Sequence, residues 1–165
     1  MAGEIARYLE QDHERIDDAL TRAESAGKDI DMNAYAEFRA ALLRHIGMEE
    51  KILLPAARAA RQGEPVQRAA QLHLDHGALA ALLVPTPTAP ILHAIRTILH
   101  RHNSIEEGPG GVYEECEQLP ALDIPGVVER LQATPPVAVA PHVDNATAME
   151  SMRSALGRAG YSFEL

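Results

Sequence analysis

The chain has 165 residues, 46% hydrophobic and 24% charged, which suits one folded domain and excludes a disordered chain. A formal net charge of -9 argues against a nucleic-acid partner, since phosphate backbones attract basic surfaces. Cys116 is the single cysteine, so no intrachain disulfide can form. The first residues lack the apolar core of a signal peptide, and no stretch is long enough to span a membrane. We therefore expect a cytoplasmic protein without a membrane partner.

Four long segments carry apolar residues at helical spacing, and glycine or proline separates each from the next. With few β-branched runs, this pattern predicts an all-α fold, a four-helix bundle. The expected helices cover residues 4–26, 31–61, 65–83 and 90–107. Pro55 is expected to bend or interrupt the second helix, because proline cannot continue a helix without distortion.

Shorter elements follow the fourth helix, which a glycine-rich break ends at residues 108–111. Short helices are expected at residues 112–118 and 125–131, and an additional short C-terminal helix at residues 145–157. Between them, the prolines of residues 134–141 predict an extended strap. We therefore divide the chain into a bundle, residues 1–132, and a segment of strap and helix, residues 133–165, that docks on the bundle or on a partner.

Each long helix places a histidine on its apolar face, when residues advance by about 100° along a helix. These histidines are His13, His45, His76 and His102. Glu49 and Glu106 each follow one of them by four residues, which puts them about 40° away on the same inward face. The sequence therefore predicts a buried group of imidazoles and carboxylates.

Other polar residues receive different positions from the same geometry. Glu50 and Glu107 lie about 140° from the inward histidines and are expected to face solvent. Asp17 is the one inward acid without a ligand role, and we expect it to orient an imidazole. His73 lies at the edge of its apolar stripe, and Cys116 is expected to be a half-buried structural thiol.

A metal ion would explain the inward residues together. An ionised glutamate among apolar side chains costs several kcal/mol unless positive charge compensates it, and no lysine or arginine lies on these faces. Neutral imidazole and carboxylate are good ligands for iron, zinc and manganese. The sequence therefore predicts a metal site in the bundle.

The motif occurs twice along the chain. Asp12-His13 followed by His45-x3-Glu49-Glu50 recurs as Asp75-His76 followed by His102-x3-Glu106-Glu107. A repeated helix pair brings two half-sites together around a pseudo-twofold axis, so the repeat predicts a centre with two metal ions.

In order and helix placement, these motifs resemble the hemerythrin-like family, also called the HHE cation-binding domain, over about residues 3–119. The resemblance implies an up-down-up-down bundle around a non-haem di-iron centre, with an oxo or hydroxo bridge. It implies His13, His45, His76 and His102 as terminal ligands, Glu49 and Glu106 as bridging carboxylates, and His73 as a candidate extra ligand. Zinc or manganese would suit the same donors.

Three functions stay open at this stage. The first is O2 binding, O2 sensing or iron handling. The second is an enzyme acting on peroxide or nitric oxide, and the third is a metal-responsive regulator that releases its C-terminal segment. We favour a metal- and oxygen-binding protein over a dedicated enzyme, because Asp17 is the one spare inward acid. The expected partner is a small molecule, and a second copy or another protein could bind residues 133–165.

Overall fold

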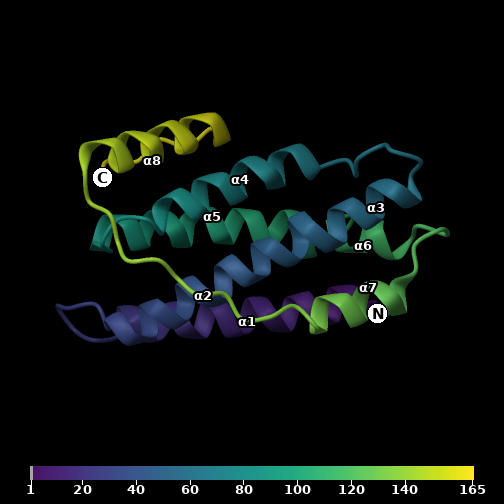
Figure 1. The fold of residues 1–165 in the computed structure, drawn as a ribbon, viewed down its shortest axis with the longest axis horizontal. Helices are drawn as coiled ribbons and strands as arrows, with labels where there is room; N and C mark the ends of the chain where they lie inside the picture. Colours follow the sequence, from purple (N-terminus) through teal and green to yellow (C-terminus); the bar gives the residue numbers. More distant parts are fainter. Residues whose placement is uncertain (1) are drawn as a thin grey trace.

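Four long helical segments lie side by side in alternating directions in the computed structural model, which describes residues 2–165 (Figure 1). They are α1 (Glu4–Glu24), the segment that starts with α2 (Met32–Met48), α4 (Ala69–Leu82) and α5 (Ala89–Glu107). The structure thus confirms the all-α, up-down-up-down bundle. None of the helices within residues 2–165 combines the length and apolar character needed to cross a membrane.

The second long segment contains one turn of π-helix. From α2 the chain continues through η1 (Glu49–Leu53) into α3 (Leu54–Ala60). The N–H of Leu54 bonds to the carbonyl of Glu49, five residues earlier, as in a π-turn. Pro55 follows directly; it lacks an N–H, and its ring would crowd a carbonyl of a regular α-turn. The irregularity expected at Pro55 therefore begins earlier, at Glu49.

Local signals account for most of the helix boundaries. Asp31 and Thr88 cap α2 and α5, since their side-chain oxygens accept free backbone N–H groups of the first turn. The third helix begins at Ala69, later than expected, because the residues after Pro65 form a turn in which the Ala69 N–H bonds to the Val66 carbonyl.

Two separate groups of buried apolar side chains fill the bundle. One includes Ile16, Phe38, Leu79 and Ile95, and the other includes Leu9, Met48, Leu72 and Val112. On α1, α2 and α4, a buried histidine lies between the residues of the two groups, and on α5 a histidine follows the first group. The buried polar residues therefore form a layer across the middle of the bundle.

The chain beyond α5 closes one end of the bundle and then returns to the other. α6 (Val112–Glu117) packs on α1 and α5, and α7 (Ile124–Gln132) packs on α1. A strap, residues 133–145, then crosses the bundle to α8 (Ala146–Ala159), which packs on α4 (Figure 1).

Side chains of α2 hold the strap in place. The guanidinium group of Arg44 donates to the carbonyl of Thr134 at 2.9 Å, and that of Arg39 donates to the carbonyl of Ala140 at 3.1 Å. These bonds guide residues 133–145 along the bundle and deliver α8 to the outer face of α4.

Candidate metal centre

Six side chains predicted for the site converge in the polar layer. They are His13 from α1, His45 from α2, Glu49 from η1, His76 from α4, and His102 and Glu106 from α5. Each is at most 7% exposed. Burial of so many ionisable groups requires compensating charge or hydrogen bonds, so their partners decide what the site can bind.

The four imidazoles form two pairs, one from each half of the repeated motif. Nε2 of His13 lies 2.9 Å from Nε2 of His45, and Nε2 of His76 lies 3.1 Å from Nε2 of His102. Two imidazole nitrogens at this distance need a shared proton or a cation, because two lone pairs repel each other. Each pair is therefore a place for positive charge.

Two carboxylates span both histidine pairs. Oε1 of Glu49 lies 3.5 Å from Nε2 of His45, and its Oε2 lies 3.0 Å from Nε2 of His76. Glu106 spans the pairs in the same way, with 3.2 Å from Oε2 to the histidine of α1 and 2.8 Å from Oε1 to that of α5. Each glutamate offers one oxygen to each pair, as a carboxylate between two metal ions would.

In two of the histidines, an aspartate pairs with Nδ1, the outer nitrogen, which faces away from the centre. Oδ2 of Asp12 lies 2.8 Å from Nδ1 of His45, and Oδ2 of Asp75 lies 3.3 Å from Nδ1 of His102. An acceptor at Nδ1 keeps a proton on that nitrogen and leaves Nε2 to face the centre. Neither aspartate was assigned a role from the sequence, although both belong to the repeated motif.

Glutamates from the opposite half of the motif hold the other two outer nitrogens. Oε1 of Glu50 lies 2.7 Å from Nδ1 of His76, and Glu107 pairs with Nδ1 of His13. The prediction that both glutamates face solvent is wrong for Glu50, whose side chain is 28% exposed, whereas Glu107 is exposed as expected but also pairs with a histidine of the centre. A helical-wheel angle describes where Cβ points, whereas a glutamate carboxylate lies three bonds further and reaches round the helix.

The carboxylates make the centre strongly attractive to positive charge. Burial lowers the pKa of His13, but its hydrogen bonds with Glu106 and Glu107 outweigh burial and raise it to about 10. Burial likewise opposes protonation of His102 and His76, yet nearby carboxylates raise the pKa of His102 to about 10 and that of His76 to about 9. Without another cation, protons would occupy these imidazoles at neutral pH.

Two buried oxygens show that the donor set fits metal ions. Within residues 2–165, Oε2 of Glu49 and Oε1 of Glu106 accept no well-aligned hydrogen bond, although both are buried and lie 3.0 and 2.8 Å from an imidazole nitrogen. One group of possible ligand atoms comes from Glu49, His76, His102 and Glu106, and a second from His13, His45 and Glu106. Atoms within each group lie within 4.8 Å of one another, close to the spread of about 4 Å expected around one ion with bonds of about 2.1 Å. The residues therefore fit a metal site, and Glu106 belongs to both groups of possible ligand atoms.

Tyr113 is a residue of the centre that sequence analysis missed. Its buried hydroxyl lies 2.7 Å from Oε1 of Glu49, 3.1 Å from Oε2 of Glu106 and 3.3 Å from Nε2 of His13. Burial and the two carboxylates raise the pKa of Tyr113 well above its usual value, so the phenol keeps its proton and donates it. Helical periodicity could not find it, because Tyr113 follows an irregular turn.

Glycine makes that turn possible. A Cβ at Gly111 would lie 2.5 Å from the carbonyl oxygen of Glu106, a distance that real side chains do not tolerate. The chain can therefore fold back sharply after α5 and place Tyr113 of α6 against the centre. The glycine-rich break was the one sequence signal that pointed to a special turn here.

His73 does not join the six converging side chains. Its side chain is 75% exposed, and its Nδ1 lies 3.2 Å from Oε1 of Glu50 on the outside of the bundle. His76, three residues later, points inward instead. A residue at the edge of an apolar stripe can turn to either side, and here His73 turns outward.

Two further expectations need correction. Asp17 is 65% exposed and pairs with Arg96 at 2.7 Å, so it orients no imidazole. An acid at the margin of the inward face of α1 lies within reach of an arginine on α5, and that contact prevails. Cys116 is fully buried, where burial and neighbouring glutamates raise the pKa of its thiol to about 12.

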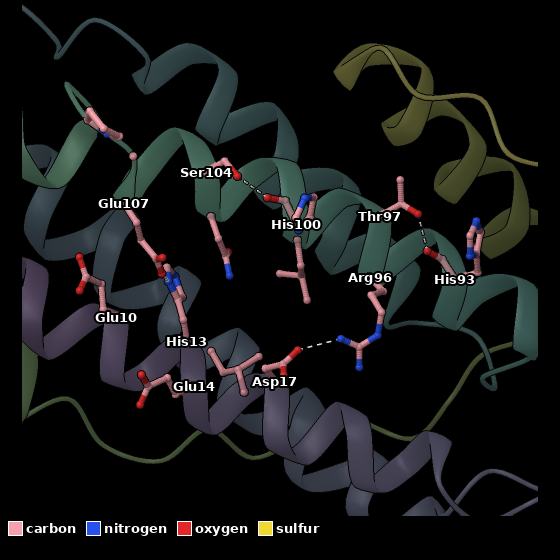
Figure 2. Close-up of a pocket in the computed structure, with 15 residues that line it drawn as sticks. Glu10, His13, Glu14, Asp17, His93, Arg96, Thr97, His100, Ser104 and Glu107 are labelled. Atoms are coloured by element: carbon pink, nitrogen blue, oxygen red, sulfur yellow. Dashed lines mark hydrogen bonds and ion pairs between the residues drawn. The ribbon is translucent and has the colours of Figure 1, made fainter.

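A cleft of about 1250 Å³ between α1 and α5 reaches the edge of the centre. Figure 2 shows His13 and Glu107 at one end of the cleft, with Glu10 beside them, and the ion pair of Asp17 and Arg96 farther along. The cleft gives small molecules or ions an approach to the His13 side of the site.

Comparison with known proteins agrees with this geometry. The model of the Hemerythrin HHE cation binding domain matches residues 4–109, more than half of the chain. The matched range contains all six converging side chains and ends before α6. No curated protein and no solved structure matches the chain. With this match and a buried histidine and glutamate cluster fit for metal, the chain belongs to the hemerythrin HHE cation binding domain family.

Proposed function

We propose that the chain binds two iron ions at the six-residue centre and uses them to bind O2 reversibly, as an oxygen-binding or oxygen-sensing protein. The observation that carries this proposal is the position of Glu49 and Glu106, each of which offers one oxygen to each histidine pair. A single-metal site has no use for two carboxylates that both reach across two separate imidazole pairs.

The donor set divides evenly between two ions. His13 and His45 would hold one ion, and His76 and His102 the other, each completed by one oxygen from each glutamate. Four protein donors leave an iron ion with open positions for a small molecule. Two ferrous ions held side by side supply electrons that O2 can accept and return.

The surroundings of the centre support a protected site for a small molecule. Apolar side chains lie on both sides of the polar layer and limit access of bulk water. The cleft between α1 and α5 leads to His13, and the hydroxyl of Tyr113 provides a hydrogen-bond donor beside the same histidine. Approach and hydrogen-bond donation therefore coincide at the His13 side.

The use of the buried acids favours binding over acid-base catalysis. Asp12 and Asp75 accept from imidazoles, and Glu49 and Glu106 face the histidine pairs. None of these acids is left over for proton transfer to a substrate, which an enzyme acting on peroxide would need.

The deciding experiment measures metal content and O2 response in the same preparation. Protein purified without a metal-affinity tag is expected to contain about two irons per chain. Its absorption spectrum should change on exposure to air and return when O2 is removed. His76→Ala should lose most of the iron, whereas His93→Ala, which alters an exposed histidine of α5, should keep it.

Each contrary outcome changes the proposal in a defined way. A single zinc ion, or no metal, would overturn the di-iron proposal. Two irons whose spectrum does not reverse when O2 is removed would keep the di-iron centre and overturn reversible O2 binding. Iron loss from His93→Ala equal to that from His76→Ala would mean that the assigned ligands are wrong.

A further inference from the structure

A chain of hydrogen bonds links the C-terminal tail to one of the inward histidines. The hydroxyl of Tyr161 donates to Oδ1 of Asp75 at 3.1 Å, and Oδ2 of Asp75 lies 3.3 Å from Nδ1 of His102. Asp75 is fully buried, so its carboxylate depends on protein groups for hydrogen bonds. Gln71 of the same helix also donates to Oδ1, at 2.8 Å, so the position of Asp75, and with it that of His102, depends on a local donor and on residues 160–165 together.

Local structure places the Tyr161 ring firmly, apart from its hydroxyl. Gly160 ends α8 with a φ of 86°, and the Tyr161 N–H then bonds back to the carbonyl of Leu156 at 2.9 Å. The ring stacks on Phe163 with centroids 6.0 Å apart, and the guanidinium carbon of Arg101 lies 5.3 Å from its centroid. Removing the hydroxyl should therefore leave the ring in place.

Packing of α8 on the bundle sets the position of this ring. Met152, Leu156 and Ala159 of α8 are buried in the apolar group that includes residues of α4. α8 and the tail lie beyond residue 109, where the family match ends. The link from Tyr161 is therefore an addition of this chain outside the matched domain.

The other half of the centre has a different arrangement. Asp12, the counterpart of Asp75, pairs with Arg15, whose side chain is 64% exposed and lies on the same helix. Each aspartate thus has a donor on its own helix, Arg15 for Asp12 and Gln71 for Asp75, and the halves differ in the second donor, Tyr161, which contacts Asp75. Among residues 2–165, it is the His76 and His102 half that takes an outer hydrogen bond from the C-terminal segment, defined as residues 146–165.

We propose that Tyr161 is a positioning residue that couples docking of the C-terminal segment to metal binding by His76 and His102. The inference rests on the proposed two-metal function. Docking adds the Tyr161 hydrogen bond to the one that Asp75 accepts from Gln71, and Asp75 then holds the His102 ring in the orientation that a ligand needs. Because such coupling is reciprocal, a metal ion in this half tightens docking of residues 146–165, and loss of the ion loosens it.

The experiment removes one hydroxyl and follows each metal ion separately. Wild type and Tyr161→Phe are loaded with ferrous iron without O2, and release into an excess of a coloured ferrous chelator is recorded. In Tyr161→Phe, one of the two ions is expected to leave about tenfold faster than in wild type, and the other at the wild-type rate. A factor of about ten is the lower end of the loss in metal affinity that follows removal of a hydrogen bond to a ligand.

Tyr8→Phe is the matched control. The Tyr8 hydroxyl donates to the carbonyl of Leu131 and accepts from Arg44, and within residues 2–165 it makes no hydrogen bond with an aspartate or a histidine. Its removal should leave both release rates unchanged. Hydrogen exchange adds a second measurement: amides of residues 146–159 should exchange more slowly with iron than without it in wild type, and this difference should shrink in Tyr161→Phe.

The outcomes separate failure of the coupling from failure of the proposed function. If wild type binds two irons but Tyr161→Phe releases both at the wild-type rates, the coupling is overturned and the iron centre stands. If Tyr8→Phe accelerates release as much as Tyr161→Phe, the effect is general and the coupling is also overturned. A wild type that binds no iron overturns both.

Discussion

The two halves of the metal centre share their inner residues but differ in what surrounds them. On each side two imidazoles face one oxygen from each glutamate, and an aspartate and a glutamate hold the outer nitrogens. Beside the His13 half lie the cleft and the Tyr113 hydroxyl. Beside the His102 half lie Tyr161 and the packed α8.

This difference separates two tasks. The repeated residues suit symmetric metal binding, because each half supplies the same donors in the same order. Small-molecule approach belongs to the first half, through the cleft at His13. Contact with the C-terminal segment belongs to the second, through Asp75. In the proposed two-metal centre, a duplicated motif would hold two equivalent ions, while the segments outside the motif make the two positions different.

The largest expected effect is on metal affinity as pH changes, and it tests what both halves share. The pKa values of His13 and His102 are raised to about 10 and that of His76 to about 9, so a metal ion must displace protons at neutral pH. For each displaced proton, metal affinity should therefore fall about tenfold for every unit by which the pH is lowered from 9 to 7. Titration with Co²⁺ at several pH values measures it.

The stability of the metal-free protein should depend on pH in the opposite direction and fall as the pH rises. A histidine whose pKa rises on folding stabilises the fold fully below its unfolded pKa of about 6.5, and that stabilisation is lost as the pH rises towards about 10. The melting temperature of metal-free protein should therefore fall from pH 6.5 to pH 10. A melting temperature that rises over this range would contradict protonated imidazoles in the centre.

The next effect tests how the halves are joined. Glu107 pairs with His13, and Glu50 pairs with His76. Each glutamate therefore belongs to one copy of the motif and contacts a histidine of the other copy. Glu107→Gln should weaken one metal position and Glu50→Gln the other, each by about 10- to 100-fold. In a His45→Ala background, which removes the first position, Glu107→Gln should have little further effect and Glu50→Gln its full effect.

The control for this pair is Glu14→Gln, which changes an exposed carboxylate in the same cleft as Glu107. It should leave metal affinity unchanged. Equal losses from Glu50→Gln and Glu107→Gln in the His45→Ala background would show that the glutamates do not cross between halves as the structure has them.

The smallest expected effect concerns the hydroxyl that only the first half has. Tyr113→Phe should keep both irons. It should release O2 several-fold faster, up to about tenfold, because bound O2 would lose the hydrogen bond that the Tyr113 hydroxyl, beside His13 and Glu49, would donate to it. Stopped-flow O2 release measures it. Tyr35→Phe is the control, since its buried hydroxyl has no hydrogen-bond partner among residues 2–165 and its side chain lies in the apolar group beyond the centre. Equal rates in Tyr113→Phe and wild type would remove Tyr113 from the small-molecule site.

Helical periodicity was enough to predict the six side chains that converge in the polar layer. Spacing of four residues on one face predicts that His45 and Glu49 point the same way, and the structure brings them within 3.5 Å. The same rule misplaced Glu50, because direction at Cβ does not determine where a long side chain ends. The family and the bundle were confirmed, since repeated motifs and apolar faces are properties of the chain itself.

Other parts of the site depend on contacts that a single sequence does not display. The glycine turn decides where Tyr113 lies, and no periodic pattern describes such a turn. Asp17 was misassigned because Arg96 belongs to a different helix, and the register between two helices cannot be worked out from either one. Tyr161 reaches Asp75 only because α8 packs on α4, a docking that its composition alone left open.

The polar layer has a consequence for how the bundle holds together. The two apolar groups share no side chain, so each stabilises its own end of the same four helices. Glu49 and Glu106 repel each other at the level of the polar layer, and positive charge on the histidines offsets this repulsion and lowers the pKa of both glutamates. Ions bound there would cross-link all four helices at the level of the polar layer. With them the bundle should open as one unit, and without them its two ends can open separately.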